Sequence, residues 1–201
     1  MVRLRILVIV LLLAGVLLAT VFLGLGQTGR GLVGEPKQAE EVKAQQRERV
    51  WEVRSGDGKM KLIGSSVKGA DETTSYTFKV VSGVDNSQRV LFSKIVGSDT
   101  TMEIPFNSWA PDNKQLFVAE RNGEGINFFV YKADGGEYAD EQDFLDVQEY
   151  WKESKNNYEI KLITGWAGDD LLVVKTMKED GSDGPPFWFV TSSRGFMRLR
   201  G

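Results

Sequence analysis

Short runs of apolar and β-branched residues, separated by turn residues, occupy the chain from residue 51 to its end. Runs rich in Val, Ile, Phe and Tyr that are interrupted by Gly, Asp and Asn are typical of strands joined by hairpin turns. The strands predicted by this pattern are 60–65, 75–81, 89–94, 101–104, 115–120, 127–132, 158–164, 171–176, 187–191 and 196–199. One segment departs from it: 140–155 has the apolar spacing of a short helix or of an irregular insertion.

Several of these strands are apolar on both faces. Phe128 and Phe129 point to opposite faces, because side chains alternate along a strand, and the runs 171–174 and 187–190 show the same pattern. A sheet with one solvated face alternates apolar and polar residues, whereas a sheet covered on both faces is apolar throughout. We therefore expect sheets stacked face to face, with Trp188 in the core.

The N-terminal part of the chain has a different pattern, because residues 6–25 are mostly apolar and carry no charge. This run, from Ile6 to Leu25, is long enough as a helix to cross a hydrocarbon core of about 30 Å. Arg3 and Arg5 precede it, so the positive-inside rule places the N-terminus in the cytoplasm. A cleaved signal peptide is the competing interpretation, but its apolar region is usually about 7–15 residues long and ends at a small-x-small site. We therefore predict a signal anchor that spans the lipid bilayer.

This anchor divides the chain into further parts. Residues 1–5 are the predicted cytoplasmic N-terminus, and 26–50 are a linker or juxtamembrane stalk whose second half is rich in helix formers. Residues 51–201 are the predicted extracytoplasmic domain, which is β-rich and long enough for one sizeable core. The expected location is therefore the cell membrane, as a single-pass protein whose C-terminal domain lies in the periplasm or outside the cell.

The domain repeats a short motif. The sequence WAPDNKQLFV begins at Trp109, and WAGDDLLVV begins 57 positions later at Trp166. A more distant copy, SGDGKMKL, contains Asp57, which precedes Asp112 by 55 positions. Steps this similar indicate three copies of one supersecondary unit, each with a hairpin turn at the Asp.

The central copy resembles the W-S-P-D-G-K-x-L-x-F repeat of TolB-type β-propellers, a family in which each repeat makes one four-stranded blade. The third copy matches in part, without the Pro, and the first copy lacks the Trp. The resemblance implies structural roles: Asp and Gly form the turn, Pro sets its entry, and Trp and Leu pack between blades. The repeat-defining residues are Trp109, Pro111, Asp112 and Leu116 in the central copy, Trp166, Asp169 and Leu172 in the third, and Asp57 and Gly58 in the first.

We therefore expect an all-β domain of three repeat units, either a partial propeller or stacked antiparallel sheets, preceded by one transmembrane helix. Propellers typically close with about 4–8 blades, and residues 51–201 supply three. The domain is then either an incomplete propeller that pairs with another chain or a set of three units that fold alone. We favour the second arrangement, since a two-chain closure rests on arithmetic alone.

Composition excludes several classes of enzyme, because the chain contains no Cys and no His. Disulfides, a thiolate nucleophile and a Cys-ligated zinc site are impossible, and so are a Ser-His-Asp triad and an HExxH zinc helix. With 25 Lys and Arg against 28 Asp and Glu, the net charge is −3, and the sequence offers no basic block to nucleic acid. We predict no nucleic-acid partner and no cofactor.

Carboxylates are the remaining candidates for acid–base chemistry. They gather in residues 140–149, at Asp169 and Asp170, and in 179–183. A glycosidase needs two carboxylates about 5–10 Å apart, one of them with a raised pKa, but Asp in the loops of a β protein more often serves the turn. The acidic loops also lack the ligand spacing of a calcium loop. We therefore predict no catalytic residue and no metal ligand.

The function that these observations favour is binding or scaffolding in the cell envelope, without catalysis. Loops at one end of the sheets are expected to contact a protein or a glycan, and nothing beyond blade arithmetic indicates an oligomer. The alternative is a carbohydrate-active envelope enzyme that uses paired Asp and Glu. Propellers host enzymes and binding proteins alike, so the resemblance does not choose between these functions.

Overall fold

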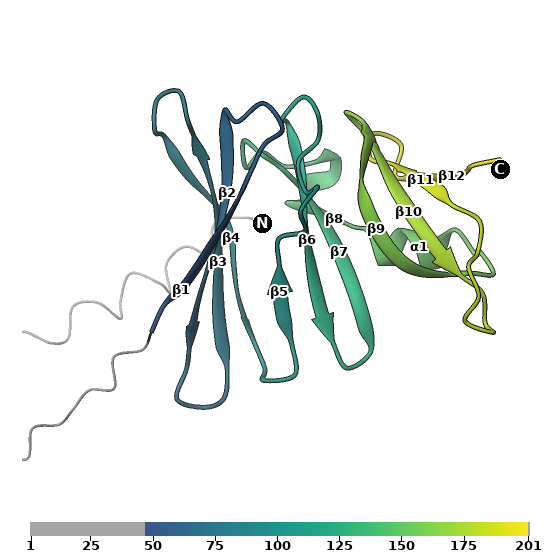
Figure 1. The fold of residues 1–201 in the computed structure, drawn as a ribbon, viewed down its shortest axis with the longest axis horizontal. Coiled ribbons are helices and arrows are strands. Elements are labelled where there is room, and N and C mark those ends of the chain that lie inside the picture. The colour runs from purple at the N-terminus through teal and green to yellow at the C-terminus, as the bar shows by residue number, and fades with distance from the viewer. Residues whose placement is uncertain (1–46, 201) are drawn as a thin grey trace, which may run out of the picture. The chain divides into compact units, whose positions relative to one another are not determined.

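Within residues 47–200, twelve strands form three four-stranded antiparallel sheets, and strands that follow one another within a sheet are hydrogen-bonded neighbours (Figure 1). These are the residues that the computed structural model describes, so the predicted anchor at 6–25 and almost all of the stalk at 26–50 lie outside them. The expected all-β fold is confirmed, and the sheets of the described residues do not close into a barrel. No helix in 47–200 is long and apolar enough to span a membrane.

We number the sheets along the chain. Sheet 1 contains β1 (Arg49–Arg54), β2 (Met60–Lys68), β3 (Thr74–Ser82) and β4 (Gln88–Val96). Sheet 2 contains β5 (Thr101–Glu103), β6 (Gln115–Asn122), β7 (Gly125–Lys132) and β8 (Phe144–Asp146). Sheet 3 contains β9 (Glu159–Gly168), β10 (Leu171–Met177), β11 (Phe187–Val190) and β12 (Gly195–Arg198).

Every predicted strand has an observed counterpart, but β1 and β8 are absent from the sequence-based prediction. β1 begins before the predicted domain start at residue 51, and several of its side chains are charged and exposed. β8 is only three residues long and lies in the segment 140–155, which continues as helix α1 (Val147–Glu153). The Asp146 carboxylate caps this helix by accepting a hydrogen bond from the Glu149 backbone N at 3.0 Å.

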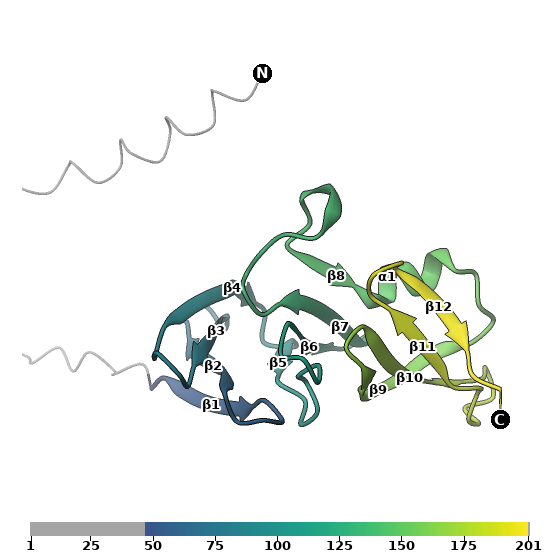
Figure 2. The same cartoon turned by 90° about the horizontal axis from the view of Figure 1, so that it is seen from above.

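Sheet 2 lies between the other two sheets, and its strand β7 is covered on both faces (Figure 2). Phe128 packs with Phe117 and Leu172 in the core shared with sheet 3. Phe129 belongs to the core shared with sheet 1, which also contains Phe78. The expectation that apolar residues on both faces of β7 indicate stacked sheets is confirmed.

Sheet 3 is covered on only one face within the described residues. Phe187 and Phe189 are buried against sheet 2. Helix α1 contributes Trp151 to this interface, and its ring meets the Phe187 ring edge-on at 5.0 Å between centroids. Trp188 alternates with these residues, points to the other face and is only partly buried. The expectation that Trp188 lies in the core is therefore wrong, because an apolar pattern does not show what covers each face.

Two tryptophans link the sheets at equivalent places. The Trp109 indole Nε1 donates to the Val53 carbonyl oxygen of sheet 1 at 3.2 Å. The Trp166 Nε1 of sheet 3 donates at 2.9 Å to the carbonyl oxygen of the residue that precedes Trp109. Trp109 is the cross-strand partner of Leu116, and Trp166 is that of Leu172. The same pair of residue types therefore joins sheet 2 to sheet 1 and sheet 3 to sheet 2.

Candidate binding cleft

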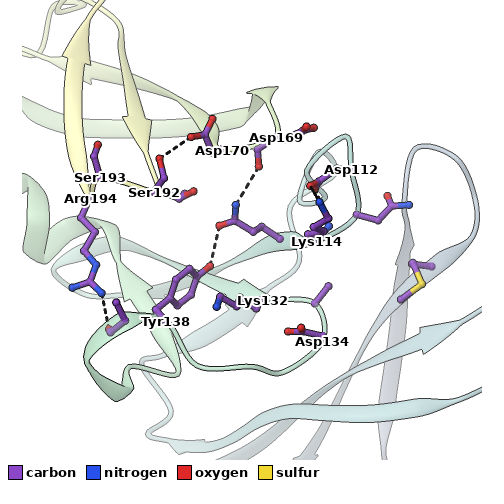
Figure 3. A pocket seen from close by; sticks show the side chains of 16 residues that line it. Asp112, Lys114, Lys132, Asp134, Tyr138, Asp169, Asp170, Ser192, Ser193 and Arg194 are labelled. Carbon is purple, nitrogen blue, oxygen red and sulfur yellow. Dashed lines mark hydrogen bonds and ion pairs between the residues drawn. The ribbon is translucent and has the colours of Figure 1, made fainter.

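Hairpin turns from the three sheets gather at one end of the domain, which we call the loop end. In a four-stranded meander the first and third turns lie at one end and the second turn lies at the other, because successive strands run in opposite directions. Sheets 2 and 3 therefore bring the turns 110–114, 133–143, 169–170 and 191–194 to the loop end. Residues of these turns, with Met60 of sheet 1, line a cleft of about 860 Å³ (Figure 3). This volume falls within the usual range for small-ligand sites.

A chain of hydrogen bonds crosses the cleft from sheet 2 to sheet 3. The Tyr138 hydroxyl donates to Gln115 Oε1 at 3.0 Å, and Gln115 Nε2 donates to the Asp169 carbonyl oxygen at 3.2 Å (Figure 3). Burial, and then the charge of Asp134, raises the pKa of Tyr138, so its hydroxyl keeps the proton that it donates. This chain fixes the Tyr138 ring and the Gln115 amide as part of the cleft lining.

The turn between β11 and β12 forms the sheet 3 side of the cleft. The Ser192 hydroxyl donates to Asp170 Oδ2 at 2.8 Å, which ties this turn to the neighbouring β9–β10 turn. Arg194 has a φ of 56°, a left-handed conformation that is uncommon for residues other than Gly and Asn. Its guanidinium Nη2 donates to the Ala139 carbonyl oxygen at 2.6 Å and so holds the long 133–143 loop against sheet 3.

The cleft carries charges of both signs that nearly balance. Four aspartates and three basic residues line it: Asp112, Asp134, Asp169 and Asp170, with Lys114, Lys132 and Arg194. Lys114 Nζ lies 3.3 Å from Asp112 Oδ2. Lys132 Nζ donates to a backbone carbonyl in the 133–143 loop at 2.6 Å and lies 5.2 Å from the centre of the Tyr138 ring. Much of the charge is therefore already partnered within the protein.

The repeat-defining residues occupy two different environments. Trp109, Leu116 and Leu172 are buried and Trp166 is partly buried, so these four pack between sheets. The remaining five lie in loop-end turns: Asp57, Gly58, Pro111, Asp112 and Asp169. Of these five, Asp112 and Asp169 line the cleft, and Asp57, Gly58 and Pro111 do not.

The turns of the first two copies have the same construction. Asp57 Oδ1 accepts a hydrogen bond from the Lys59 backbone N at 3.0 Å, and Asp112 Oδ1 accepts one from the Lys114 backbone N at 2.9 Å. The residue after each aspartate has a left-handed φ, 71° at Gly58 and 61° at Asn113. The third copy instead joins β9 to β10 through only two residues, 169 and 170. The aspartates of the first two copies therefore have the turn role that the repeat implies.

Acidic residues outside the cleft also serve turns. The 179–183 segment lies in the β10–β11 turn, at the end of sheet 3 opposite the cleft. There Asp180 accepts hydrogen bonds from Ser182, which lower its pKa, and Asp183 is paired with Lys161 at 2.6 Å, which lowers the pKa of Asp183. Within 47–200, no group of three or more Asp and Glu side chains is placed to hold a metal ion.

Sequence reasoning omitted the cleft residues Gln115, Lys132, Tyr138, Ser192 and Arg194. The sequence does contain a signal for Arg194. The Asp-Gly-Gly turn at 134–136 and the Ser-Arg-Gly turn at 193–195 each follow the aromatic strand of their repeat copy. Equivalent turns in stacked repeats lie side by side, which predicts contact between 133–143 and 191–194. Comparison with known proteins adds no further guide: no family model, curated protein or solved structure matches this chain.

Proposed function

We propose that this chain is a membrane-anchored, non-catalytic binding module of the cell envelope that recognises a short glycan in the loop-end cleft. The observation that carries this proposal is the cleft itself, because two adjacent sheets contribute fixed polar side chains to one concavity of ligand size. The proposed site lies at the loop end, where rigid strands support the loops. Loops tolerate changes of sequence more readily than strands do, and for this reason they often carry binding residues.

The mixed polarity of the lining favours a sugar over an ion. Each sugar hydroxyl both donates and accepts hydrogen bonds, so it matches a surface that presents carboxylates, amides, hydroxyls and ammonium groups together. A strongly charged ligand would meet like charges there, since four aspartates and three basic residues share the cleft. The Tyr138 ring lines the cleft and adds an aromatic surface. A protruding protein loop is the other class of partner and is distinguished by the test below.

Binding without hydrolysis is proposed because the cleft lacks a suitable acid. A glycosidase acid is held in apolar surroundings that favour its protonated form. In contrast, the Asp134 and Asp169 side chains are exposed, Asp112 contacts Lys114, and Asp170 accepts a hydrogen bond from a serine. These aspartates therefore have the exposed or hydrogen-bonded surroundings of turn residues, and none has the apolar surroundings of a glycosidase acid.

We propose further that the three sheets are three blades related to the TolB-type repeat. Three observations support this relationship. Each sheet is a four-stranded meander, and a cross-strand Trp–Leu pair occurs in both the second and the third sheet. In the first sheet, Val53 and Leu62 form the equivalent cross-strand pair. Val53 replaces the tryptophan, in keeping with the weak motif of that copy.

Replacing Lys114 by Ala is expected to weaken glycan binding about tenfold, because a charge-assisted hydrogen bond to a ligand contributes about 1.5 kcal/mol. The full chain, purified in detergent, is applied to an array of neutral and acidic oligosaccharides, and the best neutral ligand is titrated by calorimetry. Lys114 is well suited to this change because its side chain is 82 % exposed, so its loss leaves the core intact.

Lys59→Ala is the matched control. Lys59 Nζ lies 3.2 Å from Asp57 Oδ2, the equivalent pair in the first copy, but Lys59 does not line the cleft. The Lys59→Ala variant should bind the oligosaccharide with the same affinity as the unaltered chain. The proposal fails if no oligosaccharide binds, if both variants lose affinity equally, or if the ligand is hydrolysed. Binding that appears only with peptides would assign the cleft to a protein partner instead.

A labelling experiment tests the proposed anchor and its orientation. The chain has no Cys, so Glu179→Cys in the exposed β10–β11 turn supplies a single thiol. In intact cells, a membrane-impermeant maleimide should label this thiol, and the labelled chain should stay in the membrane fraction after alkaline extraction. Labelling only after the cells are broken, or release of the labelled chain by alkali, would contradict the proposed topology.

A further inference from the structure

The 133–143 loop, which forms part of the sheet 2 side of the cleft, contains a small closed hairpin at 138–142. The Tyr138 backbone N donates to the Gln142 carbonyl oxygen at 2.6 Å, and the two residues form an isolated antiparallel bridge. A single 3₁₀ turn, Ala139–Glu141, lies between them. The Tyr138 ring, which lines the cleft, is therefore carried by a unit too short to have a core of its own.

Side chains of the neighbouring elements hold this hairpin in place. Gln115 of β6 accepts a hydrogen bond from the Tyr138 hydroxyl at 3.0 Å. The Tyr150 hydroxyl of helix α1 donates at 2.9 Å to the side chain at the end of the hairpin. Arg194 of the β11–β12 turn donates from Nη2 to the Ala139 carbonyl oxygen at 2.6 Å (Figure 3). The first two contacts join the hairpin to β6 and α1, and Arg194 joins it to sheet 3.

Arg194 occupies a backbone position that suits glycine better. Its φ of 56° lies in the left-handed region, where the Cβ of an L-residue is crowded and Gly is favoured. A residue other than Gly costs stability there, and positions of this kind gather at ligand clamps and active sites. The turn therefore gives up some stability to keep an arginine, and the contact that this arginine makes is its hydrogen bond to the hairpin.

We propose that Arg194 is a positioning residue for the loop-end cleft: by holding the hairpin at 138–142 against sheet 3, it keeps the Tyr138 ring where a ligand meets it. This role rests on the proposed function of the cleft and explains how the cleft is kept ready to bind. A cleft that is preformed in only a fraction of the molecules binds with an affinity reduced by that fraction. Fixing a loop in its binding conformation therefore raises affinity without any contact to the ligand.

Arg194→Gly separates binding from stability. In the full chain purified in detergent, this change should weaken binding of the best neutral oligosaccharide from the array about tenfold, because a hydrogen bond from a charged donor is lost. The loss should appear as slower association, with dissociation nearly unchanged, since fewer molecules carry the preformed cleft.

Glu72→Gly is the matched control. Glu72 has a φ of 62° and lies in the exposed β2–β3 turn, at the end opposite the cleft. The two variants should unfold at the same urea concentration, because each places Gly at a left-handed position of a hairpin turn. Glu72→Gly should bind the oligosaccharide as the unaltered chain does.

Hydrogen exchange measures the position of the hairpin without any oligosaccharide. The Tyr138 amide reports it, because this N–H donates within the hairpin. Arg194→Gly should speed its exchange about tenfold, while the amides of β7 exchange as in the unaltered chain.

The positioning role is overturned if Arg194→Gly binds the oligosaccharide normally, if it leaves exchange at Tyr138 unchanged, or if Glu72→Gly loses as much affinity. Weaker binding through faster dissociation alone would make Arg194 a direct ligand contact, which also overturns it. If the unaltered chain binds no oligosaccharide, the proposed function fails, and exchange at Tyr138 then decides whether Arg194 holds the hairpin.

Discussion

Trp109→Ala is expected to lower the free energy of unfolding by about 3–5 kcal/mol, the usual cost of removing a large aromatic side chain from a core. Trp109 is 7 % exposed and belongs to the core between sheets 1 and 2. Its removal also leaves the Val53 carbonyl oxygen without the indole donor that lies 3.2 Å away. Domains of this kind are stable by about 5–15 kcal/mol, so the loss is a large fraction of the total. Urea unfolding of the full chain, followed by circular dichroism, measures it.

Two further variants divide this loss into packing and hydrogen bonding. Trp109→Phe keeps much of the apolar volume but removes the donor, and it should lose less than Trp109→Ala. Trp166→Phe removes the equivalent donor of the third copy, whose nitrogen lies 2.9 Å from its acceptor, and should cost a similar amount. Phe106→Ala is the control, since Phe106 is 89 % exposed, and it should change stability by less than about 0.5 kcal/mol. Equal effects of Trp109→Ala and Phe106→Ala would contradict the assigned packing.

Phe117→Ala is expected to cost about 3–5 kcal/mol as well, through the other core. Phe117 is fully buried between sheets 2 and 3, where its ring lies 6.2 Å from that of Phe128 and 6.4 Å from that of Trp166, between centroids. Because sheet 2 takes part in both cores, weakening this interface should lower the stability of the whole domain. A single unfolding transition, shifted to lower urea concentration, is the expected result.

The conservative variant Phe117→Leu calibrates this measurement. It keeps most of the buried apolar volume and should lose less than about 1.5 kcal/mol. Hydrogen exchange locates the effect: the amides of β3 in sheet 1 should lose protection together with those of β10 in sheet 3. If β10 alone loses protection while β3 keeps it, the three sheets are independent units and the account of a shared central sheet is wrong.

The strands could be predicted from the sequence because their signal is local. Alternating β-branched and aromatic residues mark strands such as β3 and β7, and Asp-Gly or Asp-Asn pairs mark the turns. β1 is harder to predict, because it is an edge strand that contains the charged residues Arg49, Glu52 and Arg54. Its composition therefore resembles that of the charged stalk before it. β8 pairs only three residues of the segment 140–155 with β7, too few for a periodic signal.

The cleft could be predicted only in part, because it depends on which turns become neighbours. Asp112 and Asp169 were identified as equivalent turn residues, and their equivalence already places them on adjacent sheets at the same end. Tyr138 lies in a loop without periodicity, and only the folded structure shows that its hydroxyl reaches Gln115. Arg194 reaches across to Ala139 from a left-handed turn position that the sequence does not indicate.

The uncovered face of sheet 3 shows a second limit of predicting structure from the apolar pattern. Strand β11 is apolar on both faces in the same way as β7, yet only β7 is covered on both sides within the described residues. Periodicity reports that a face is apolar, whereas the order of sheets in the stack decides what meets it. The uncovered face of Trp188 therefore becomes visible only when the sheets are placed.

The central claim is that the loop-end cleft is where this module binds its ligand, and amide chemical-shift mapping tests it most directly. The ¹⁵N-labelled full chain is titrated with the neutral oligosaccharide that binds best on the array. We expect the largest shifts in three turns contributed by two sheets: 112–115, 133–139 and 191–194. Shifts confined to the β2–β3 and β10–β11 turns at the opposite end, or no shifts at all, would contradict the claim.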